Sequence, residues 1–225
     1  MLDWSKISTV LLDMDGTLLD LHFDNQFWVH HIPKKLALKS GKSLQECYQK
    51  MSDEYEQVNG QLQWYCLDYW AQRLQIDIME AKRELDHLIT MREDSIPFLD
   101  ALKASERKVV LVTNAHPDSL SLKVEKTKLD DHIDTLISTH QFGVSKESQS
   151  LWKQLHEFVG FNPDTTLFVD DSERILDVAK QYGIAFTLGI SNPDSQLPDT
   201  EFSNHLYTNN YLDLLESIEN APFVK

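Results

Sequence analysis

The chain has 225 residues, of which 41% are hydrophobic and 25% are charged, and its formal net charge is −15 when histidines are counted as neutral. A chain of this length forms one sizeable domain, or one domain that carries a smaller insert. The negative charge argues against a nucleic-acid polymer as the partner, because such a binder needs a basic face that displaces counterions from phosphates.

The N-terminal residues, MLDWSKIST, lack the pattern of a secretory signal, and the uninterrupted aliphatic runs are too short to cross a bilayer. The sequence therefore predicts a cytoplasmic protein without a membrane partner. Cys47 and Cys66, the only two cysteines, are expected to be reduced thiols in the protein core. No sequence feature indicates an oligomeric state.

The first expected element is a buried strand at 8–12, which runs directly into Asp13 and Asp15. Alternate residues of an extended chain point the same way, so the two carboxylates reach one place. Such a pair resists joint ionisation unless a cation compensates, and Mg²⁺ prefers carboxylates together with water and phosphate oxygens. The strand end is therefore predicted to bind magnesium. Two loop aspartates that cap Thr17 are the plainer alternative.

A helical block follows at about 22–94. Its candidate helices lie at 24–39, 43–58, 64–75 and 78–90. Ser43 and Glu46 have the spacing of a capping box at the start of the second helix. Because the block starts just past the two aspartates, we expect it to cover the strand end where ligands of open α/β sheets bind. The predicted division is a catalytic core of residues 1–21 and 95–225 and a helical cap of residues 22–94.

The helical block is rich in aromatic residues, most of which we expect to pack inside it. The candidates for a surface that binds a flat ring are Phe27, Trp64, Tyr65 and Tyr69. Residues three or four apart share a helix face, so Tyr65 and Tyr69 lie together. Candidate polar partners of such a ring are Asn25, Gln26 and Asn59.

Beyond this block, short aliphatic segments alternate with helix-like segments. Strands are expected at 108–112, 134–138, 165–169 and 184–188. Helices are expected at 97–106, 117–128, 147–159 and 172–182. Alternation of this kind is typical of an α/β fold with a doubly wound parallel sheet. The helical cap is then an insert after the first strand of that sheet.

Polar side chains follow several of these strands. Thr113 and Asn114 supply a hydroxyl and an amide after the second strand, and Lys146 follows the third at the end of a loop. Asp170 and Asp171 end the fourth strand with two more carboxylates. Each signal is weak alone, but together they predict a site for a phosphoryl group at one edge of the sheet.

The string DMDGT, the Thr113–Asn114 pair, Lys146 and the final aspartate pair resemble, in order and spacing, the four motifs of the haloacid dehalogenase (HAD) superfamily of phosphotransferases. The helical insert is similar to the C1 cap of that superfamily, so the resemblance implies a Rossmann-like core with a cap. Asp15 implies phosphoryl transfer, because the dehalogenase branch has no acid there. One departure is Glu147, which follows the lysine where many members have proline.

That departure leaves other lysines open for the phosphate-binding role, namely Lys123, Lys126 and Lys128. A closer resemblance covers about residues 8–216 and includes the strings WYCLDYW, TNAHP, STHQFG and LGISNPDS. These strings are similar to the GMP/IMP nucleotidase branch of bacteria. The resemblance implies a small-molecule substrate, a purine nucleoside 5′-monophosphate such as GMP or IMP.

The resemblance also implies a role for each motif. Asp13 is the nucleophile that forms an aspartyl-phosphate, and Asp15 is the general acid and base. Mg²⁺ binds Asp13, the backbone carbonyl of Asp15 and Asp171, with Asp170 close by. The phosphoryl oxygens are held by Thr113, Asn114 and Lys146.

Three alternatives remain open at this point. A HAD phosphatase for a small phosphorylated metabolite, such as a sugar phosphate or phosphoglycolate, has the same motifs. A response-regulator receiver also combines acids, a hydroxyl and a lysine, but it lacks a cap. The third alternative is a catalytically silent binding protein on the same scaffold. The nine histidines show no metal-ligand spacing, and His116 is a candidate for contact with the leaving group.

Overall fold

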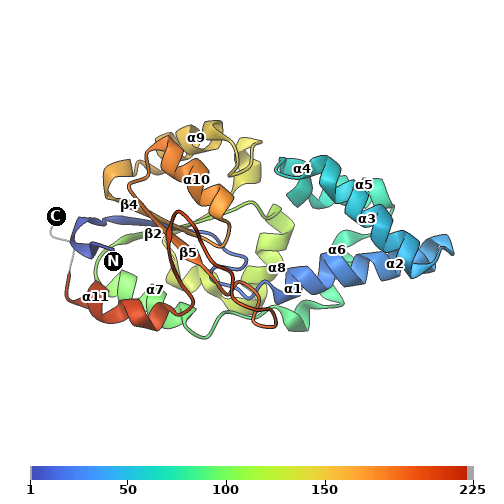
Figure 1. Cartoon of the computed structure of the whole chain (residues 1–225), viewed down its shortest axis with the longest axis horizontal. Coiled ribbons are helices and arrows are strands. Elements are labelled where there is room, and N and C mark those ends of the chain that lie inside the picture. Colours follow the sequence, from blue (N-terminus) through green and yellow to red (C-terminus); the bar gives the residue numbers. More distant parts are fainter. Residues whose placement is uncertain (1, 222–225) are drawn as a thin grey trace.

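The computed structural model describes residues 2–221, and within them the core is a six-stranded parallel sheet (Figure 1). The strands are β1 (Thr9–Leu12), β2 (Lys108–Thr113), β3 (Thr135–Ser138), β4 (Thr166–Asp170), β5 (Phe186–Ile190) and β6 (Leu206–Thr208). Their order in the sheet is β3-β2-β1-β4-β5-β6, and every neighbouring pair is parallel. The predicted α/β class and doubly wound sheet are therefore confirmed.

The first five strands each lie within two residues of the expected ranges, whereas β6 was not predicted from the sequence. The sixth strand has only three residues at the edge of the sheet, and its side chains are largely exposed, so it lacks the apolar run of a buried strand. The chain passes from one side of β1 to the other between β3 and β4. The carboxyl ends of β1 and β4 therefore flank the switch point, where open sheets bind ligands.

Helices cover both faces of the sheet (Figure 1). The helices of the core are α7 (Ser95–Ala104), α8 (Pro117–Thr127), α9 (Gln149–Val159), α10 (Glu173–Tyr182) and α11 (Leu215–Glu219). Alternation within β1 shows how the two layers form: Val10 and Leu12 pack toward α7 and α11, whereas Leu11 packs toward α9 and α10. All three side chains are fully buried, as expected for a central parallel strand.

A second group of helices lies beside the core, on the right in Figure 1. Its members are α1 (His22–Asn25), the π-helix η2 (Gln26–His31), α2 (Ile32–Ser40), α3 (Leu44–Val58), α4 (Leu62–Tyr65), α5 (Leu67–Leu74) and α6 (Ile78–Arg83). The first three are continuous and match the helix expected at 24–39. Ser43 and Glu46 form both hydrogen bonds of the predicted capping box at the start of α3.

Two helix predictions in this group were wrong. The helix expected at 64–75 is broken at Cys66, whose backbone is extended, and the indole N–H of Trp70 donates to the Trp64 carbonyl that the break leaves free. The helix expected at 78–90 ends at Arg83. Beyond it the chain bends, so that Ile89 packs against the core helix α8.

We propose that residues 22–94 form a separate cap domain on a core of residues 1–21 and 95–225. This division is supported by a hydrophobic cluster built only from cap helices, with Phe27 and Trp70 at its centre. It is also supported by a single β-bridge between Leu19 and Met91, where the chain enters and leaves the cap.

Both cysteines are free thiols, as predicted, but only Cys47 is buried, whereas Cys66 is partly exposed and is not a core residue. Among residues 2–221, no helix combines the length and the apolar character that crossing a bilayer requires.

Candidate active site

The site lies at the carboxyl edge of the sheet, where three neighbouring strands end. Asp13 directly follows β1, Thr113 is the last residue of β2, and Asp170 is the last residue of β4. The backbone N–H of Asp13 donates to the Val169 carbonyl at 2.9 Å, which continues the ladder between β1 and β4. Parallel pairing therefore places these side chains together although they are far apart in the sequence.

Lys146 forms ion pairs with two of the acids at this edge. Its Nζ donates to Asp13 Oδ1 at 2.5 Å and to Asp170 Oδ2 at 2.7 Å, and all three side chains are buried. Burial disfavours the charged ammonium, but the two carboxylates outweigh that effect and raise the pKa of Lys146 above its usual range. An ammonium has three N–H donors, so one donor remains for a further oxygen.

Three carboxylates form a cluster that exceeds the charge of this lysine. Ligand oxygens of Asp13, Asp170 and Asp171 lie within 4.8 Å of one another. Burial raises the pKa of Asp13 from 3.8 to about 6, and burial together with the two neighbouring acids raises the pKa of Asp171 well above its usual range. A cluster of hard oxygen ligands with uncompensated negative charge fits a small divalent cation.

Gly16 brings the turn after β1 against this cluster. Its φ of +78° is in the left-handed region, and a Cβ built on it would lie 2.5 Å from Asp171 Oδ2. Only glycine therefore lets the backbone of the DMDGT turn approach the Asp171 carboxylate so closely.

Asn114 and Glu147 link Lys146 to the cap. Asn114 Oδ1 accepts a hydrogen bond from the backbone N–H of Lys146 at 2.9 Å, and its Nδ2 donates to Glu147 Oε2 at 3.1 Å. The other oxygen of Glu147 accepts from the hydroxyl of Tyr65 in the cap at 2.9 Å. Glu147, which the sequence showed only as a departure from the family pattern, thus joins core and cap.

Asp15 belongs to a second charge network. Lys123 Nζ donates to Asp15 Oδ1 and to Asp24 Oδ2, both at 2.6 Å, and Lys82 Nζ donates to Asp24 Oδ1 at 3.1 Å. Both lysine side chains are buried, with exposed fractions of 1% for Lys82 and 2% for Lys123. Burial acts against ionisation of Asp24, but the two lysines lower its pKa to about 2. Lys123, one of the alternatives to Lys146, therefore pairs with Asp15 and not with the acidic cluster.

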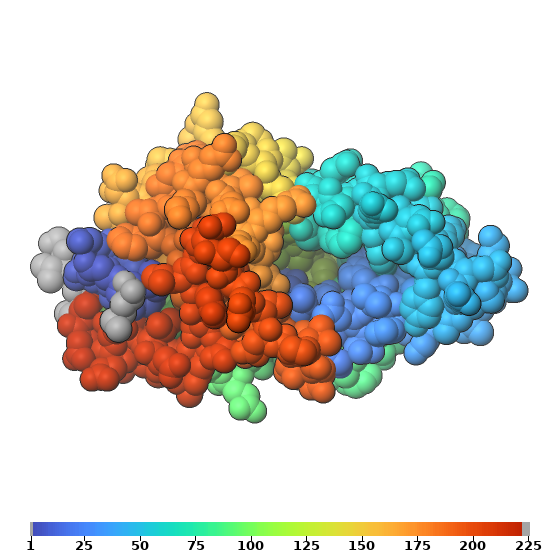
Figure 2. Space-filling model, in the orientation of Figure 1, coloured from blue at the N-terminus to red at the C-terminus, as the bar shows by residue number. Residues whose placement is uncertain are grey.

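A pocket of about 450 Å³ lies between the core edge and the cap, and Figure 2 shows the hollow between them. The core contributes the predicted residues of the four motifs, Asp13, Asp15, Thr113, Asn114, Lys146, Asp170 and Asp171. From the cap, Trp64 and Tyr65 line the pocket as expected, and so do Trp28 and Tyr55, which were not singled out from the sequence. Asn25, Asn59 and His116 also line it.

The other two aromatic candidates do not line this pocket. Phe27 is fully buried in the cap cluster, where it stacks on Phe23 and has Lys82 Nζ 4.5 Å from its ring centre. Tyr69 packs edge-on against Trp70. Helix spacing alone did not show which aromatic residues of the cap meet the core, so these two predictions were wrong.

Comparison with known proteins identifies the family. The family model described as haloacid dehalogenase-like hydrolase matches residues 7–183. The chain belongs to this family. It is 48% identical over 215 residues to the GMP/IMP nucleotidase YrfG of Escherichia coli strain K12, a match that covers 96% of this chain and 97% of that protein.

More distant relatives share the same fold. Phosphoglycolate phosphatase of Aquifex aeolicus is 24% identical over 202 residues, which cover 86% of this chain and 91% of that protein. The crystal structure of a HAD phosphatase from Thermococcus onnurineus superimposes with a TM-score of 0.81 at 21% identity, covering 96% of this chain and all of that one. The structural likeness supports the core-and-cap architecture described above.

The Asp24 network predicts a large loss of stability on removal of one charge. Asp24→Asn should lower the free energy of unfolding by about 3–5 kcal/mol, because it leaves buried Lys82 and Lys123 without their shared partner. The control is Glu125→Gln, which breaks an exposed pair with Arg83. This pair joins α8 to α6, the helices that carry Lys123 and Lys82, and its loss should cost less than about 0.5 kcal/mol. Urea unfolding measures both values, and equal losses would contradict the assigned role of burial.

The raised pKa of Asp13 predicts how the stability of the metal-free protein depends on pH. The folded protein binds this proton more tightly than the unfolded chain, so wild-type protein should lose stability relative to Asp13→Asn as pH rises from about 4 to about 6. The measurement is the urea midpoint of both proteins across this range with a chelator present. Midpoints that run parallel, or that diverge in the opposite direction, would show that burial does not raise this pKa.

Proposed function

We propose that this protein is a Mg²⁺-dependent 5′-nucleotidase that hydrolyses purine nucleoside monophosphates, GMP and IMP, through an aspartyl-phosphate. The observation that carries the proposal is the buried Asp13, placed beside two further carboxylates and Lys146 at the floor of a pocket that the cap covers. The name and near full-length identity of the Escherichia coli relative support the same substrate class.

In the first step, a carboxylate oxygen of Asp13 attacks phosphorus in line with the bond to the ribose O5′. The new bond joins Asp13 to phosphorus, and the bond to O5′ breaks. In the second step, a water oxygen attacks the same phosphorus, the bond to Asp13 breaks, and inorganic phosphate leaves. Asp13 is thereby regenerated.

Asp15 supplies and takes back the proton. It donates a proton to the departing O5′ and later accepts one from the attacking water. Burial raises its pKa to about 6 although Lys123 opposes the shift, so a larger fraction of Asp15 is protonated near neutral pH than for an ordinary aspartate. Lys123 occupies Oδ1 of this carboxylate, so we assign proton transfer to Oδ2.

Mg²⁺ fits the acidic cluster, where carboxylates of Asp13, Asp171 and Asp170 and the backbone carbonyl of Asp15 would hold it. The ion supplies positive charge that offsets repulsion between the carboxylate and the phosphate. Gly16 keeps Asp171 against the turn of the first motif.

The phosphoryl oxygens are held by donors that the protein leaves unused. The hydroxyl oxygen of Thr113 accepts the backbone N–H of Ala115 at 3.0 Å, so its hydrogen is directed to another acceptor. Lys146 also retains one N–H. Asn114 lines the same pocket with an amide that also contacts Glu147 and Tyr65. These donors lie where negative charge develops on the transferring group.

We assign recognition of the base to the cap aromatics that line the pocket, Trp28, Tyr55, Trp64 and Tyr65. Asn25 and Asn59 supply candidate hydrogen-bond partners for the ring. Phe27 and Tyr69 have only an indirect role, because they do not line the pocket. Phe27 packs edge-on against Trp28, and Tyr69 packs edge-on against Trp70. A pocket volume of about 450 Å³ is within the range of small-ligand sites.

Phosphate release from a substrate panel tests the proposal. GMP and IMP should be hydrolysed faster than pyrimidine monophosphates, a sugar phosphate or phosphoglycolate, and only with Mg²⁺ present. Asp13→Asn should reduce kcat by a factor on the order of 10⁴ or more. The control Asp130→Asn removes an exposed acid that precedes β3, at the opposite edge of the sheet, and should keep full activity. Equal rates on phosphoglycolate and GMP would favour the metabolite phosphatase instead.

The role of the Thr113 hydroxyl is tested separately. Thr113→Val removes the donor but keeps the shape of this buried side chain, and kcat/KM should fall about 10²- to 10³-fold. Thr113→Ser keeps the hydroxyl and should retain most of the activity. If the two variants have the same kcat/KM, the hydroxyl does not contact the phosphoryl group.

A further inference from the structure

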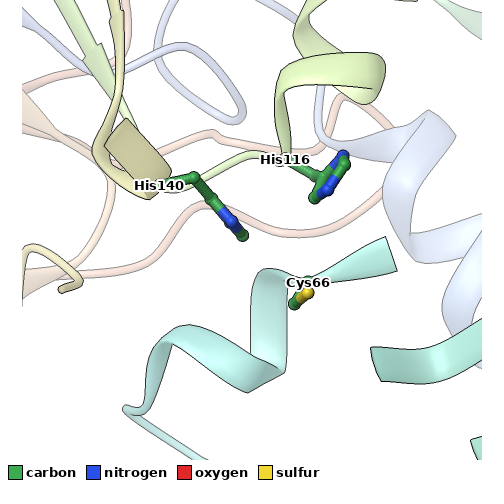
Figure 3. A group of neighbouring side chains, drawn as sticks. All are labelled: Cys66, His116 and His140. Carbon is green, nitrogen blue, oxygen red and sulfur yellow. The ribbon is translucent and has the colours of Figure 1, made fainter. Parts of the chain in front are cut away.

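A second cluster of metal-ligating side chains lies at the rim of the pocket. Cys66 belongs to the cap, between α4 and α5, whereas His116 precedes α8 and His140 lies in the 3₁₀ turn η5 (Thr139–Phe142) of the core. One ligand atom from each lies within 4.8 Å of the others. Figure 3 shows that the three side chains surround one small space.

His140 has a ring nitrogen that makes no hydrogen bond in the described structure. Its Nε2 is buried and has no hydrogen-bond partner among residues 2–221. A buried polar nitrogen without a partner is costly, and a neutral imidazole is the form that binds metals.

His116 has a carboxylate on each side of its ring. Asp68 Oδ2 of the cap lies 3.6 Å from Nε2, and Asp118 Oδ2 lies 3.7 Å from Nδ1. A metal-bound histidine usually passes the N–H of its other nitrogen to a carboxylate, which fixes the ring orientation. The backbone N–H of Asp118 donates to His116 Nδ1 at 3.3 Å, so the ion is assigned to Nε2, and its binding replaces this bond by an Nδ1–H that donates to the Asp118 carboxylate.

We propose that Cys66, His116 and His140 bind one divalent cation of the Zn²⁺ class, at a site distinct from the acidic cluster. One thiolate and two imidazoles are the ligands of Zn²⁺ and Co²⁺, whereas Mg²⁺ prefers oxygen. The Cys66 thiol releases its proton to solvent when the bond forms. The fourth position of a tetrahedron is open to water or to the nearby Asp68.

Such an ion would join the cap to the core. Cys66 lies between Tyr65 and Leu67, which line the substrate pocket, and His116 lines it from the core side. A bond from the ion to each side fixes the width of this rim. Given the proposed nucleotidase function, Zn²⁺ should therefore inhibit turnover by holding the cap against the core.

Co²⁺ titration of the full chain, with excess Mg²⁺ to saturate the acidic cluster, tests the site without an activity assay. The expected spectrum has a thiolate-to-cobalt charge-transfer band that saturates at one ion per chain and disappears when Zn²⁺ is added. Binding without a thiolate band would place the ion at oxygen ligands elsewhere and would overturn the proposal.

Variants assign the ligands. Cys66→Ser and His140→Gln should each weaken Co²⁺ binding by at least about tenfold. Mutation of a residue that only hydrogen-bonds a metal ligand already costs about that much, so loss of a ligand should cost no less. Cys47→Ala is the matched control, because it removes the other thiol, which is buried in the cap cluster, and should leave the band unchanged. Unchanged affinity in Cys66→Ser would overturn the proposal.

A thiol-protection experiment keeps the test decisive if a ligand variant fails to fold. In Cys47→Ala, Cys66 is the only thiol, so its alkylation rate can be read directly. Zn²⁺ should slow this rate at least about tenfold, whereas Mg²⁺ should not. An unchanged rate with Zn²⁺ would exclude Cys66 as a ligand.

The effect on turnover is measured with Mg²⁺ saturating. Zn²⁺ should inhibit wild-type protein at concentrations that leave Cys66→Ser active. The Zn²⁺ concentration for half-inhibition should be at least about tenfold higher for Cys66→Ser, in line with the weaker binding. Equal sensitivity of the two proteins would overturn the coupling between this site and the cap. If no nucleotide is hydrolysed at all, the proposed function fails, and the cobalt band and thiol protection still decide whether the metal site exists.

Discussion

The excess of buried negative charge at the carboxyl edge of the sheet is the constraint on which the rest of the site depends. Parallel pairing of β1 with β4 brings Asp13 beside Asp170 and Asp171, and the fold cannot separate them without breaking the central ladder. Lys146 offsets part of this charge. Its ion pairs with Asp13 and Asp170 hold the loop after β3, which carries it, against this edge of the sheet. The remaining charge is the basis of the proposed binding of a cation and, through that cation, of phosphate.

The cap and the core are joined by polar contacts that also involve the proposed catalytic groups. Glu147 connects the Asn114 amide to Tyr65, and Lys123 connects Asp15 to Asp24 at the start of the cap. In both cases a side chain that would act on the substrate shares a partner with the helical lid. The position of the cap is therefore linked to the orientation of the groups beneath it.

The sequence predicted the parts of the structure that depend on local pattern. Five buried strands are continuous apolar runs, and motif residues at their ends were placed correctly at one edge because parallel strands end together. What it could not predict depends on how distant segments meet. Phe27 and Trp28 are adjacent and equally aromatic, yet only Trp28 lines the pocket. Cys66, His116 and His140 have no spacing motif, because they come from three separate elements.

The position of β1 has a consequence for how the chain acquires its structure. Thr9 pairs with Lys108 on one side and with Thr166 on the other, so the central strand is made first but has both neighbours only after β4 has been made. During synthesis the cap helices, whose hydrophobic cluster is built only from cap residues, emerge before either neighbour of β1. The apolar segment TVLL therefore stays without a sheet while much of the chain is translated, and this is the stage at which the nascent protein most needs protection from aggregation.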